Sequence, residues 1–245
     1  MIDLNSKRRG PIENLVHSQL LLLGDSHLGA FRQALPQAGF LAWQYQICEL
    51  RDATLLGLRN PAGVTPALGA FRRFLADKNR AATVLLQLGE ADCGFAMWHR
   101  VRKFNEPIAD QLRMVIAAYL SLIHELRRGG FIDIVVTGAV PPVIADPALA
   151  THFPEERREI TASYGERLKL TLDHNRLLQA HARDLGLRYI DISSELIDPA
   201  TKAVRIECRS ADPGDHYLDS LAAGALWAGK LRGLFEVDNR RRPAA

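Results

Sequence analysis

A serine stands where an apolar run ends in a tight turn. The leucines at residues 20–23 are followed by Gly24, Asp25, Ser26 and His27, an order that predicts a buried strand, a turn and then a helix. A serine at the mouth of a helix lies among unpaired backbone N–H groups and at the positive end of the helix dipole, where negative charge is stabilised. This setting favours acyl transfer through an oxyanion. The alternative is that Ser26 only caps the helix.

Two later segments carry further polar side chains at the ends of apolar stretches. One follows the run at residues 83–88, the other precedes the last amphipathic stretch, and they read Gly89-Glu90-Ala91-Asp92-Cys93 and Asp212-Pro213-Gly214-Asp215-His216. Together with Gly24-Asp25-Ser26, they resemble in order and spacing the three blocks of the SGNH/GDSL hydrolase superfamily, which are Gly-Asp-Ser, Gly-x-Asn-Asp and Asp-x-x-His. The resemblance covers residues 18–235.

Within this superfamily the chain is most similar to a bacterial branch that has Gly-Glu-Ile-Asp-Cys-Arg in place of Gly-x-Asn-Asp. The corresponding residues here are Gly89-Glu90-Ala91-Asp92-Cys93-Gly94. Residues 53–61 are similar to a Gly-Ala-Thr-Ala-x-Gly-Leu-x-Asn-Pro segment of the same proteins, and a further shared turn is Val140-Pro141-Pro142.

Short apolar runs alternate with helical patterns along the chain. We predict strands at residues 19–23, 40–47, 83–88, 131–137 and 187–192, and helices at 28–35, 65–75, 108–126, 160–185 and 220–235. This alternation implies parallel pairing with helices on both faces. The predicted fold is therefore an α/β class three-layer α/β/α sandwich with a flavodoxin-like five-stranded parallel sheet. Ligands bind at the carboxyl ends of such strands, where Ser26 and Glu90 would share one rim.

We expect one folded domain at residues 18–236, preceded by a flexible arm at 1–17 and followed by a flexible tail at 237–245. A chain of 245 residues with 47% hydrophobic content is long enough for one large core. No cofactor is predicted.

A serine nucleophile needs a base that removes its proton and later gives one to the leaving group. His216 is the predicted base, because it directly precedes the last helix, where the chain returns to the rim with Ser26. A carboxylate must fix the orientation of the imidazole. The family spacing would place it at position 213, which is Pro213, so Asp212 is the first candidate and Asp215 the alternative.

The resemblance also implies an oxyanion site. Its donors would be the backbone N–H of Ser26, a second N–H after the second strand, and normally an asparagine amide, which is missing because position 91 is Ala91. A protonated Glu90, or a side chain outside the motif, would have to replace that amide. The predicted oxyanion and binding set is Asp52 or Gly57 with Gly89, Glu90 and Ala91.

The remaining polar residues near these motifs have two interpretations each. Asp25 and Asp92 are predicted to be structural, holding turns through bonds to backbone N–H groups. His27 is either an auxiliary donor beside the substrate or a water-exposed histidine at the helix mouth. Trp98 and His99 either wall a pocket for a sugar or an anionic group, or belong to a surface loop with one buried tryptophan.

Composition argues against several other classes of protein. The net charge of +3 is spread along the chain, so we expect no nucleic-acid partner. Cys48, Cys93 and Cys208 have no metal-ligand spacing, so no metal site is predicted and reduced, cytoplasmic thiols are favoured. No apolar stretch reaches the roughly 20 residues that a membrane span needs. The oligomeric state is not predicted.

These observations lead to one preferred function and two alternatives. The preferred one is a serine esterase that removes an acyl group, with acetyl favoured, from a carbohydrate or other small-molecule ester through an acyl-serine intermediate. The first alternative is an acyltransferase that passes the acyl group to a sugar hydroxyl at the same site. The second is a catalytically silent carbohydrate-binding or scaffolding domain, suggested by Ala91 and the irregular spacing from Asp212 to His216.

Overall fold

The computed structural model describes residues 19–51, 53–59, 67–144, 160–212 and 214–241, and describes side chains as far as residue 236. Asp52 and the predicted arm at 1–17 lie outside these ranges.

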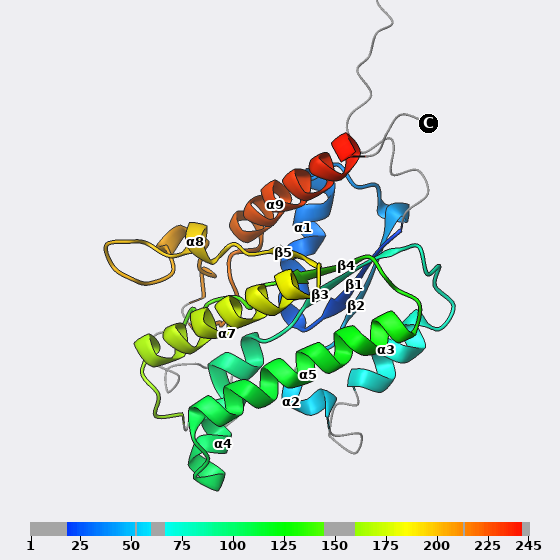
Figure 1. Ribbon diagram of the computed structural model, residues 1–245. Helices are drawn as coiled ribbons and strands as arrows, with labels where there is room; N and C mark the ends of the chain where they lie inside the picture. The colour runs from blue at the N-terminus through cyan, green and yellow to red at the C-terminus, as the bar shows by residue number, and fades with distance from the viewer. Residues whose placement is uncertain (1–18, 52, 60–66, 145–159, 213, 242–245) are drawn as a thin grey trace, which may run out of the picture.

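A five-stranded parallel sheet lies at the centre of the molecule (Figure 1). Its order is β2-β1-β3-β4-β5, the order of flavodoxin-like folds. The strands are β1 (Leu20–Gly24), β2 (Tyr45–Glu49), β3 (Thr83–Gln87), β4 (Ile134–Thr137) and β5 (Arg188–Ile190). The prediction of a flavodoxin-like parallel sheet is confirmed. All strands point the same way, so the segments that leave their carboxyl ends meet along one rim.

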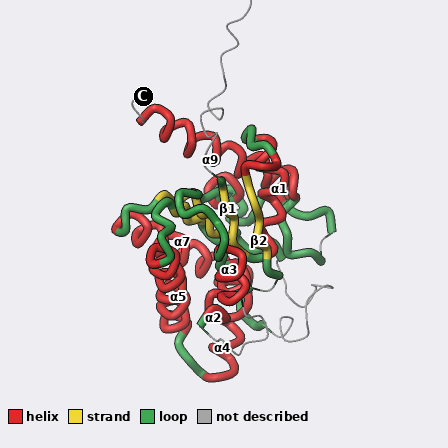
Figure 2. The backbone as a smooth tube through the Cα atoms, turned by 90° about the vertical axis from the view of Figure 1, so that its right-hand side faces the viewer, coloured by secondary structure: helices red, strands yellow, loops and turns green. Residues whose placement is uncertain are grey.

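Helices cover both faces of the sheet, as Figures 1 and 2 show from two directions. One face carries α1 (Gly29–Gln37) and α9 (Ser220–Arg241). The helices on the other side are α2 (Leu55–Leu58), α3 (Ala67–Leu75), α4 (Met97–Phe104), α5 (Ile108–Arg128) and α7 (Tyr164–Asp184). A short helix, α8 (Ser193–Leu196), follows β5.

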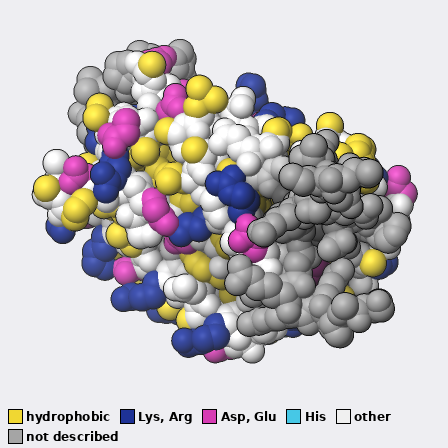
Figure 3. Space-filling model, turned by 90° about the horizontal axis from the view of Figure 1, so that it is seen from above, with side chains coloured by type: hydrophobic (Ala, Val, Ile, Leu, Met, Phe, Trp, Pro, Cys, Tyr) yellow, Lys and Arg dark blue, Asp and Glu magenta, His cyan; other side chains and the backbone are white. Residues whose placement is uncertain are grey.

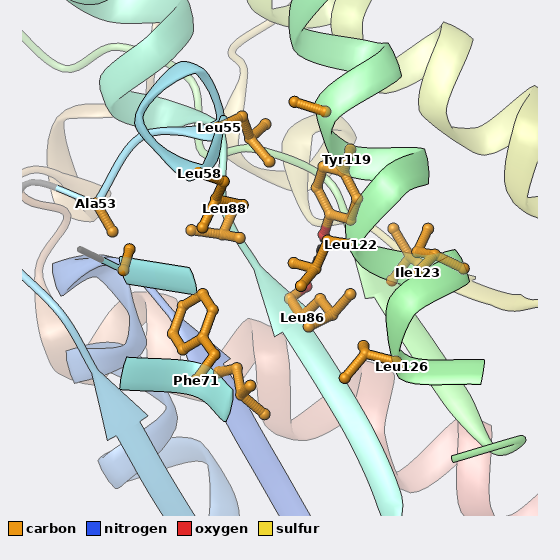
Figure 4. Close-up of a cluster of buried hydrophobic side chains, with 14 of the residues drawn as sticks. Ala53, Leu55, Leu58, Phe71, Leu86, Leu88, Tyr119, Leu122, Ile123 and Leu126 are labelled. Carbon is orange, nitrogen blue, oxygen red and sulfur yellow. Dashed lines mark hydrogen bonds between the residues drawn. The ribbon is translucent and has the colours of Figure 1, made fainter. Parts of the chain in front are cut away.

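Alternation along β1 divides the core between the two faces. Leu20 and Leu22 pack towards α1 and α9, while Leu21 and Leu23 pack towards α3 and α5, because successive side chains of a strand point to opposite faces. In the second of these clusters, the Tyr119 hydroxyl on α5 donates a hydrogen bond of 3.1 Å to the Leu86 carbonyl (Figure 4). The buried phenol therefore keeps a polar partner inside an apolar cluster.

Several element boundaries differ from the predicted ones. The second strand begins at Tyr45, because residues 42–44 form a 3-10 turn. The fourth helix begins at Tyr164, after Ser163 and Glu166 form a reciprocal capping box. The segment after β3 forms a π-helical turn (Asp92–Ala96) that continues into α4. The last helix runs to Arg241, past the expected domain boundary at 236.

The surface carries charges of both signs. On the face seen in Figure 3, Lys and Arg side chains alternate with Asp and Glu over the described residues. Among the helices that the structure describes, none combines the length and the apolar character that crossing a bilayer requires.

Candidate active site

The turn that carries Ser26 is fixed by a close approach of two strands. The end of β1 is bonded on both sides, because Leu50 N–H donates to the Gly24 carbonyl at 2.9 Å and Asp25 N–H donates to the Gln87 carbonyl at 3.1 Å. A Cβ atom at Gly24 would lie 2.0 Å from the Gln87 carbonyl oxygen, so only glycine fits here. Ser26 then opens a 3-10 turn (Ser26–Leu28) that leads directly into α1.

Asp25 holds this turn from inside the protein. Its side chain is 1% exposed, and Oδ1 accepts a 2.9 Å hydrogen bond from the His27 backbone N–H. The other oxygen, Oδ2, is buried and has no hydrogen-bond partner among the described residues. Burial raises the pKa of Asp25 to about 6.

The segment before α9 reaches the same rim from the far end of the chain. The His216 ring lies edge-on to the His27 ring, with 5.7 Å between the ring centroids. The Tyr217 ring lies 5.2 Å from His27 and 4.1 Å from His216. Burial raises the pKa of Tyr217, while a hydrogen bond between its hydroxyl and Ser26 acts in the opposite direction. The structure thus brings the predicted nucleophile and the predicted base into one cluster.

Both carboxylates considered as partners of His216 lie in the turn before it. Asp215 Oδ1 is 3.7 Å from His216 Nδ1 and accepts the Tyr217 backbone N–H at 3.2 Å. Asp212 Oδ1 accepts the Gly214 backbone N–H at 2.8 Å. Asp215 therefore has a measured approach to the imidazole, and Asp212 helps to shape the turn that presents it.

A buried histidine and glutamate face each other behind Ser26. His27 Nε2 is 3.2 Å from Glu90 Oε2, and the side chains are 4% and 5% exposed. Burial alone would lower the pKa of His27, but the carboxylates of Glu90, Asp25 and Asp215 raise it above its usual value. The interpretation of His27 as a water-exposed residue at the helix mouth is wrong, because Glu90 and the ring of Tyr217 enclose it.

Backbone N–H groups of the segment after β2 donate hydrogen bonds to side chains of the protein itself. Asp92 accepts hydrogen bonds from Leu55 N–H at 2.7 Å and Leu56 N–H at 3.1 Å. Gly57 N–H donates to Thr54 Oγ1 at 2.9 Å. Burial raises the pKa of Asp92 to about 7, although these two backbone bonds oppose the rise. In this arrangement Gly57 N–H already has a partner within α2, while Asp52, its alternative as oxyanion donor, lies outside the described residues.

Residues that follow Glu90 border a second cavity, separate from the one beside Ser26. Ala91 is buried and lines a cavity of about 300 Å³ together with Phe95, His99 and Arg100. Trp98 donates its indole N–H to the Cys93 carbonyl at 2.8 Å and packs against the core. His99 thus borders a cavity, while Trp98 braces the π-helical turn. Neither belongs to a loop, because both lie in α4.

Gly89 has a positive φ of 117° and lies over a second buried histidine. A Cβ atom at this position would lie 3.0 Å from His174 Cε1 and 3.2 Å from Ala139 Cβ. The backbone conformation and the contact both favour glycine. His174 therefore packs directly beneath the start of the Glu90 motif.

A cavity of about 230 Å³ opens beside Ser26. Ser26, His27 and Tyr217 contribute to its wall, Leu218 and Trp227 supply apolar surface, and Glu49 and Arg51 add charged groups. This volume suits a small acyl group and a small alcohol.

His27, Glu90 and His216 also form the donor set of a metal site. Each offers one ligand atom, and these atoms lie within 4.8 Å of one another. No metal site was expected from the sequence, because its three cysteines have no metal-ligand spacing. The set comes from three separate segments, so only the fold brings it together.

Neither the His27–Glu90 pair nor the place of Tyr217 in the site was predicted from the sequence. His27 and Glu90 leave the ends of two adjacent strands, β1 and β3, whose pairing places those ends side by side. That pairing was available as a signal once both strands had been predicted. Tyr217 carries no motif of its own, and its role follows only from its place next to His216.

Comparison of sequences alone finds no relatives: no protein-family model and no curated protein matches the chain.

Comparison of structures finds clear matches. A GDSL-like lipase from Bacteroides thetaiotaomicron superposes with a TM-score of 0.58 at 15% identity, covering 94% of this chain and 92% of its own. An aryl esterase from M. smegmatis superposes with a TM-score of 0.58 at 14% identity, covering 90% of this chain and 99% of its own. At 14–15% sequence identity, these matches show a shared fold and do not show a shared substrate or mechanism. The predicted resemblance is therefore confirmed at the level of the fold: this chain has the three-layer architecture of the solved GDSL and SGNH hydrolases.

Proposed function

We propose that the chain is a serine esterase that removes an acyl group, with acetyl favoured, from a carbohydrate or other small ester. The observation that carries this proposal is the meeting of the Ser26 turn with the segment at 215–217, where His27 contacts both His216 and Tyr217 and Tyr217 hydrogen-bonds Ser26. The fold shared with solved lipases and esterases supports it.

In the proposed reaction, Ser26 Oγ attacks the ester carbonyl while His216 accepts the serine proton. The tetrahedral intermediate then collapses, the alcohol leaves with the proton from His216, and an acyl-serine remains. Water, activated by the same imidazole, releases the acid and restores Ser26. Asp215 or Asp212 holds the imidazole in the required orientation.

The oxyanion needs at least two donors. Ser26 N–H is one of them in our proposal, and Gly57 N–H is already bonded to Thr54. Tyr217 is our candidate for the donor that Ala91 does not supply, because its hydroxyl group hydrogen-bonds Ser26. Loss of one oxyanion donor typically lowers turnover about 10²–10³-fold, so Tyr217→Phe should show a large kcat effect with little change in KM.

The size and polarity of the cavity support a small substrate. A volume of about 230 Å³ accommodates a short acyl chain and a sugar-sized alcohol better than a long lipid. Glu49 and Arg51 place hydrogen-bonding groups in the wall that could bind sugar hydroxyls. Acetyl esters should therefore be hydrolysed faster than octanoyl esters of the same alcohol.

A fluorophosphonate probe tests the nucleophile directly, because it reacts covalently with an activated serine. The wild type should be labelled, while Ser26→Ala should not. Ser194→Ala, which changes an exposed serine on α8, should be labelled like the wild type. Equal labelling of the wild type and Ser26→Ala would remove Ser26 from the mechanism. Absence of labelling and of p-nitrophenyl acetate hydrolysis in the folded wild type would favour a silent binding domain.

A matched pair of variants tests the carboxylate. Asp215→Asn and Asp212→Asn remove the same charge three residues apart in one turn. The residue that orients His216 should lower kcat far more than the other, with KM nearly unchanged. Equal, small effects of both would mean that neither carboxylate orients the base.

A further inference from the structure

His27, Glu90 and His216 form a donor set that suits a transition metal, although the proposed esterase reaction needs no metal. Two imidazoles and one carboxylate form the donor set of several zinc sites, and imidazole nitrogen suits zinc better than it suits magnesium or calcium. The three residues come from the Ser26 turn, the segment after β3 and the segment before α9. A site with three protein ligands leaves one position open for water.

The distances in the cluster match this use. Around a tetrahedral zinc ion with bonds of about 2.1 Å, neighbouring ligand atoms lie about 3.4 Å apart. The His27 Nε2 to Glu90 Oε2 distance of 3.2 Å is close to this value. The ligand atoms of all three residues fall within 4.8 Å of one another, which is close enough for one ion to draw them together.

His27 Nε2 is a buried nitrogen whose nearest polar neighbour is a carboxylate. It lies 3.2 Å from Glu90 Oε2, and the two side chains are 4% and 5% exposed. A metal ion between the two side chains would accept a lone pair from His27 Nε2 and one from Glu90 Oε2. The carboxylates of Asp25 and Asp215 add negative potential at His27, which favours a cation. His27 also borders the cavity beside Ser26, which gives an ion a route from solvent.

We propose that His27, Glu90 and His216 bind Zn²⁺, and that the bound ion reversibly inhibits the enzyme by occupying the base. The inhibition rests on the proposed esterase function, whereas the binding does not. An imidazole bound to zinc through Nε2 has no lone pair there for the serine proton, and one bound through Nδ1 carries its proton on Nε2. In either case His216 cannot activate Ser26.

Binding is tested on the full chain without an affinity tag, stripped with EDTA and titrated with ZnCl₂ against a chromophoric chelator. The wild type and Ser26→Ala should both bind one equivalent of zinc. Glu90→Gln and His27→Gln should bind at least about tenfold more weakly. His124→Gln, which changes an exposed histidine on α5, should bind like the wild type. Wild-type protein that binds no zinc, or Glu90→Gln that binds as tightly as the wild type, would overturn the proposal.

Two further measurements keep the test decisive if a variant folds poorly. Co²⁺ added to the wild type should give the visible absorption of a tetrahedral nitrogen and oxygen site, and added zinc should abolish it. Zinc should also raise the unfolding temperature of wild type and Ser26→Ala, because a ligand that binds only the folded state stabilises it. No cobalt spectrum and no zinc-dependent shift in either protein would contradict the site.

Activity separates the two parts of the proposal. Hydrolysis of p-nitrophenyl acetate by the wild type should fall more than tenfold with stoichiometric zinc, recover on addition of EDTA, and be unaffected by magnesium. Zinc binding without esterase activity in the stripped protein would remove the proposed function but keep the site. Esterase activity that persists with one bound zinc would disprove the inhibition.

Discussion

Two buried histidines lie close to the carboxyl rim of the sheet, and their surroundings drive them in opposite directions. His27 faces the Glu90 carboxylate, and its pKa is raised. His174 on α7 packs beneath Gly89 with its Nδ1 3.1 Å from the amide oxygen of Asn175, and burial lowers its pKa to about 4. Burial penalises the charged form of both, so the carboxylates at the rim make the difference.

The difference in pKa separates a histidine with a structural role from one in the candidate active site. His174 is buried and neutral, and its neighbour Asn175 bonds both the N–H and the carbonyl of Ala139 at 2.7 and 2.9 Å. Both residues of α7 therefore help to hold the segment that follows β4. His27 and His216 belong to a charged cluster that borders a cavity. Variants on the two sides should consequently affect different measurements.

The largest effect should be on catalysis. His216→Gln should lower kcat/KM by at least about 10³-fold, because it removes the proposed base. His174→Gln should change kcat/KM less than tenfold, because a buried neutral imidazole has no route to the substrate. Steady-state hydrolysis of p-nitrophenyl acetate measures both. A folded His174→Gln protein that is as inactive as His216→Gln would abolish the distinction between the two regions.

The second effect is steric and lies at the boundary of the two regions. Gly89→Ala should lower the free energy of unfolding by about 2–3 kcal/mol, because it combines a positive φ with a Cβ pressed against the His174 ring. Urea unfolding at pH 7 measures the change. Gly165→Ala is the control, since a Cβ there meets nothing within 4 Å, and it should leave stability nearly unchanged. An unchanged midpoint for Gly89→Ala would mean that His174 moves aside freely.

The third effect concerns the acid limb of stability. A histidine whose pKa is lowered on folding contributes stability above its unfolded pKa of 6.5, and this stability is lost as the pH falls towards about 4. Between pH 7 and pH 4.5 the loss due to His174 should be about 2 kcal/mol. The decline should be correspondingly shallower in His174→Gln, while His124→Gln should keep the wild-type slope. Parallel pH curves for wild type and His174→Gln would contradict the buried neutral state.

The smallest effect has the opposite sign and belongs to the rim. The pKa of Asp25 rises from 3.8 to about 6 on folding, so its contribution to stability is present below pH 3.8 and is lost as the pH rises through 6. The loss between pH 5 and pH 7 should be about 1 kcal/mol. Asp25→Asn keeps an acceptor for His27 N–H and should decline less over this interval in urea unfolding. Parallel declines of the wild type and Asp25→Asn would show that folded Asp25 is already ionised at pH 5.

Much of the fold could be predicted because its signals are local. Five short apolar runs separated by helical patterns suffice to predict a parallel sheet, and the order β2-β1-β3-β4-β5 confirms the flavodoxin-like architecture. Boundaries were harder to predict, because tertiary contacts set them. In the π-helical turn at Asp92–Ala96, for example, Asp92 accepts hydrogen bonds from N–H groups of α2, far away in the sequence. The start of α7 was also predicted wrongly, at residue 160, although the Ser163 and Glu166 capping box that sets it is a local pattern.

The residues of the candidate site also fall into two groups, those marked by local sequence motifs and those that depend on tertiary contacts. Ser26 and His216 could be selected from motifs, because their neighbours in the sequence are distinctive. The His27–Glu90 pair was not selected, because the predicted strands place both residues at one rim but do not give the orientation of their side chains. The partners of Gly57 N–H and of Asp92 likewise depend on which groups the fold leaves unpaired, and sequence spacing carries no information about that.

The close approach at Gly24 limits how this protein could be redesigned. The cavity wall offers positions for variation, since Glu49 ends β2 and Arg51 follows it, whereas Leu218 precedes α9, and neither segment is held as closely as the end of β1. Position 24 allows no variation, because any side chain would meet the Gln87 carbonyl and push apart the two strands that carry Ser26 and Glu90. A library built to change substrate preference should therefore randomise the wall and keep this one glycine.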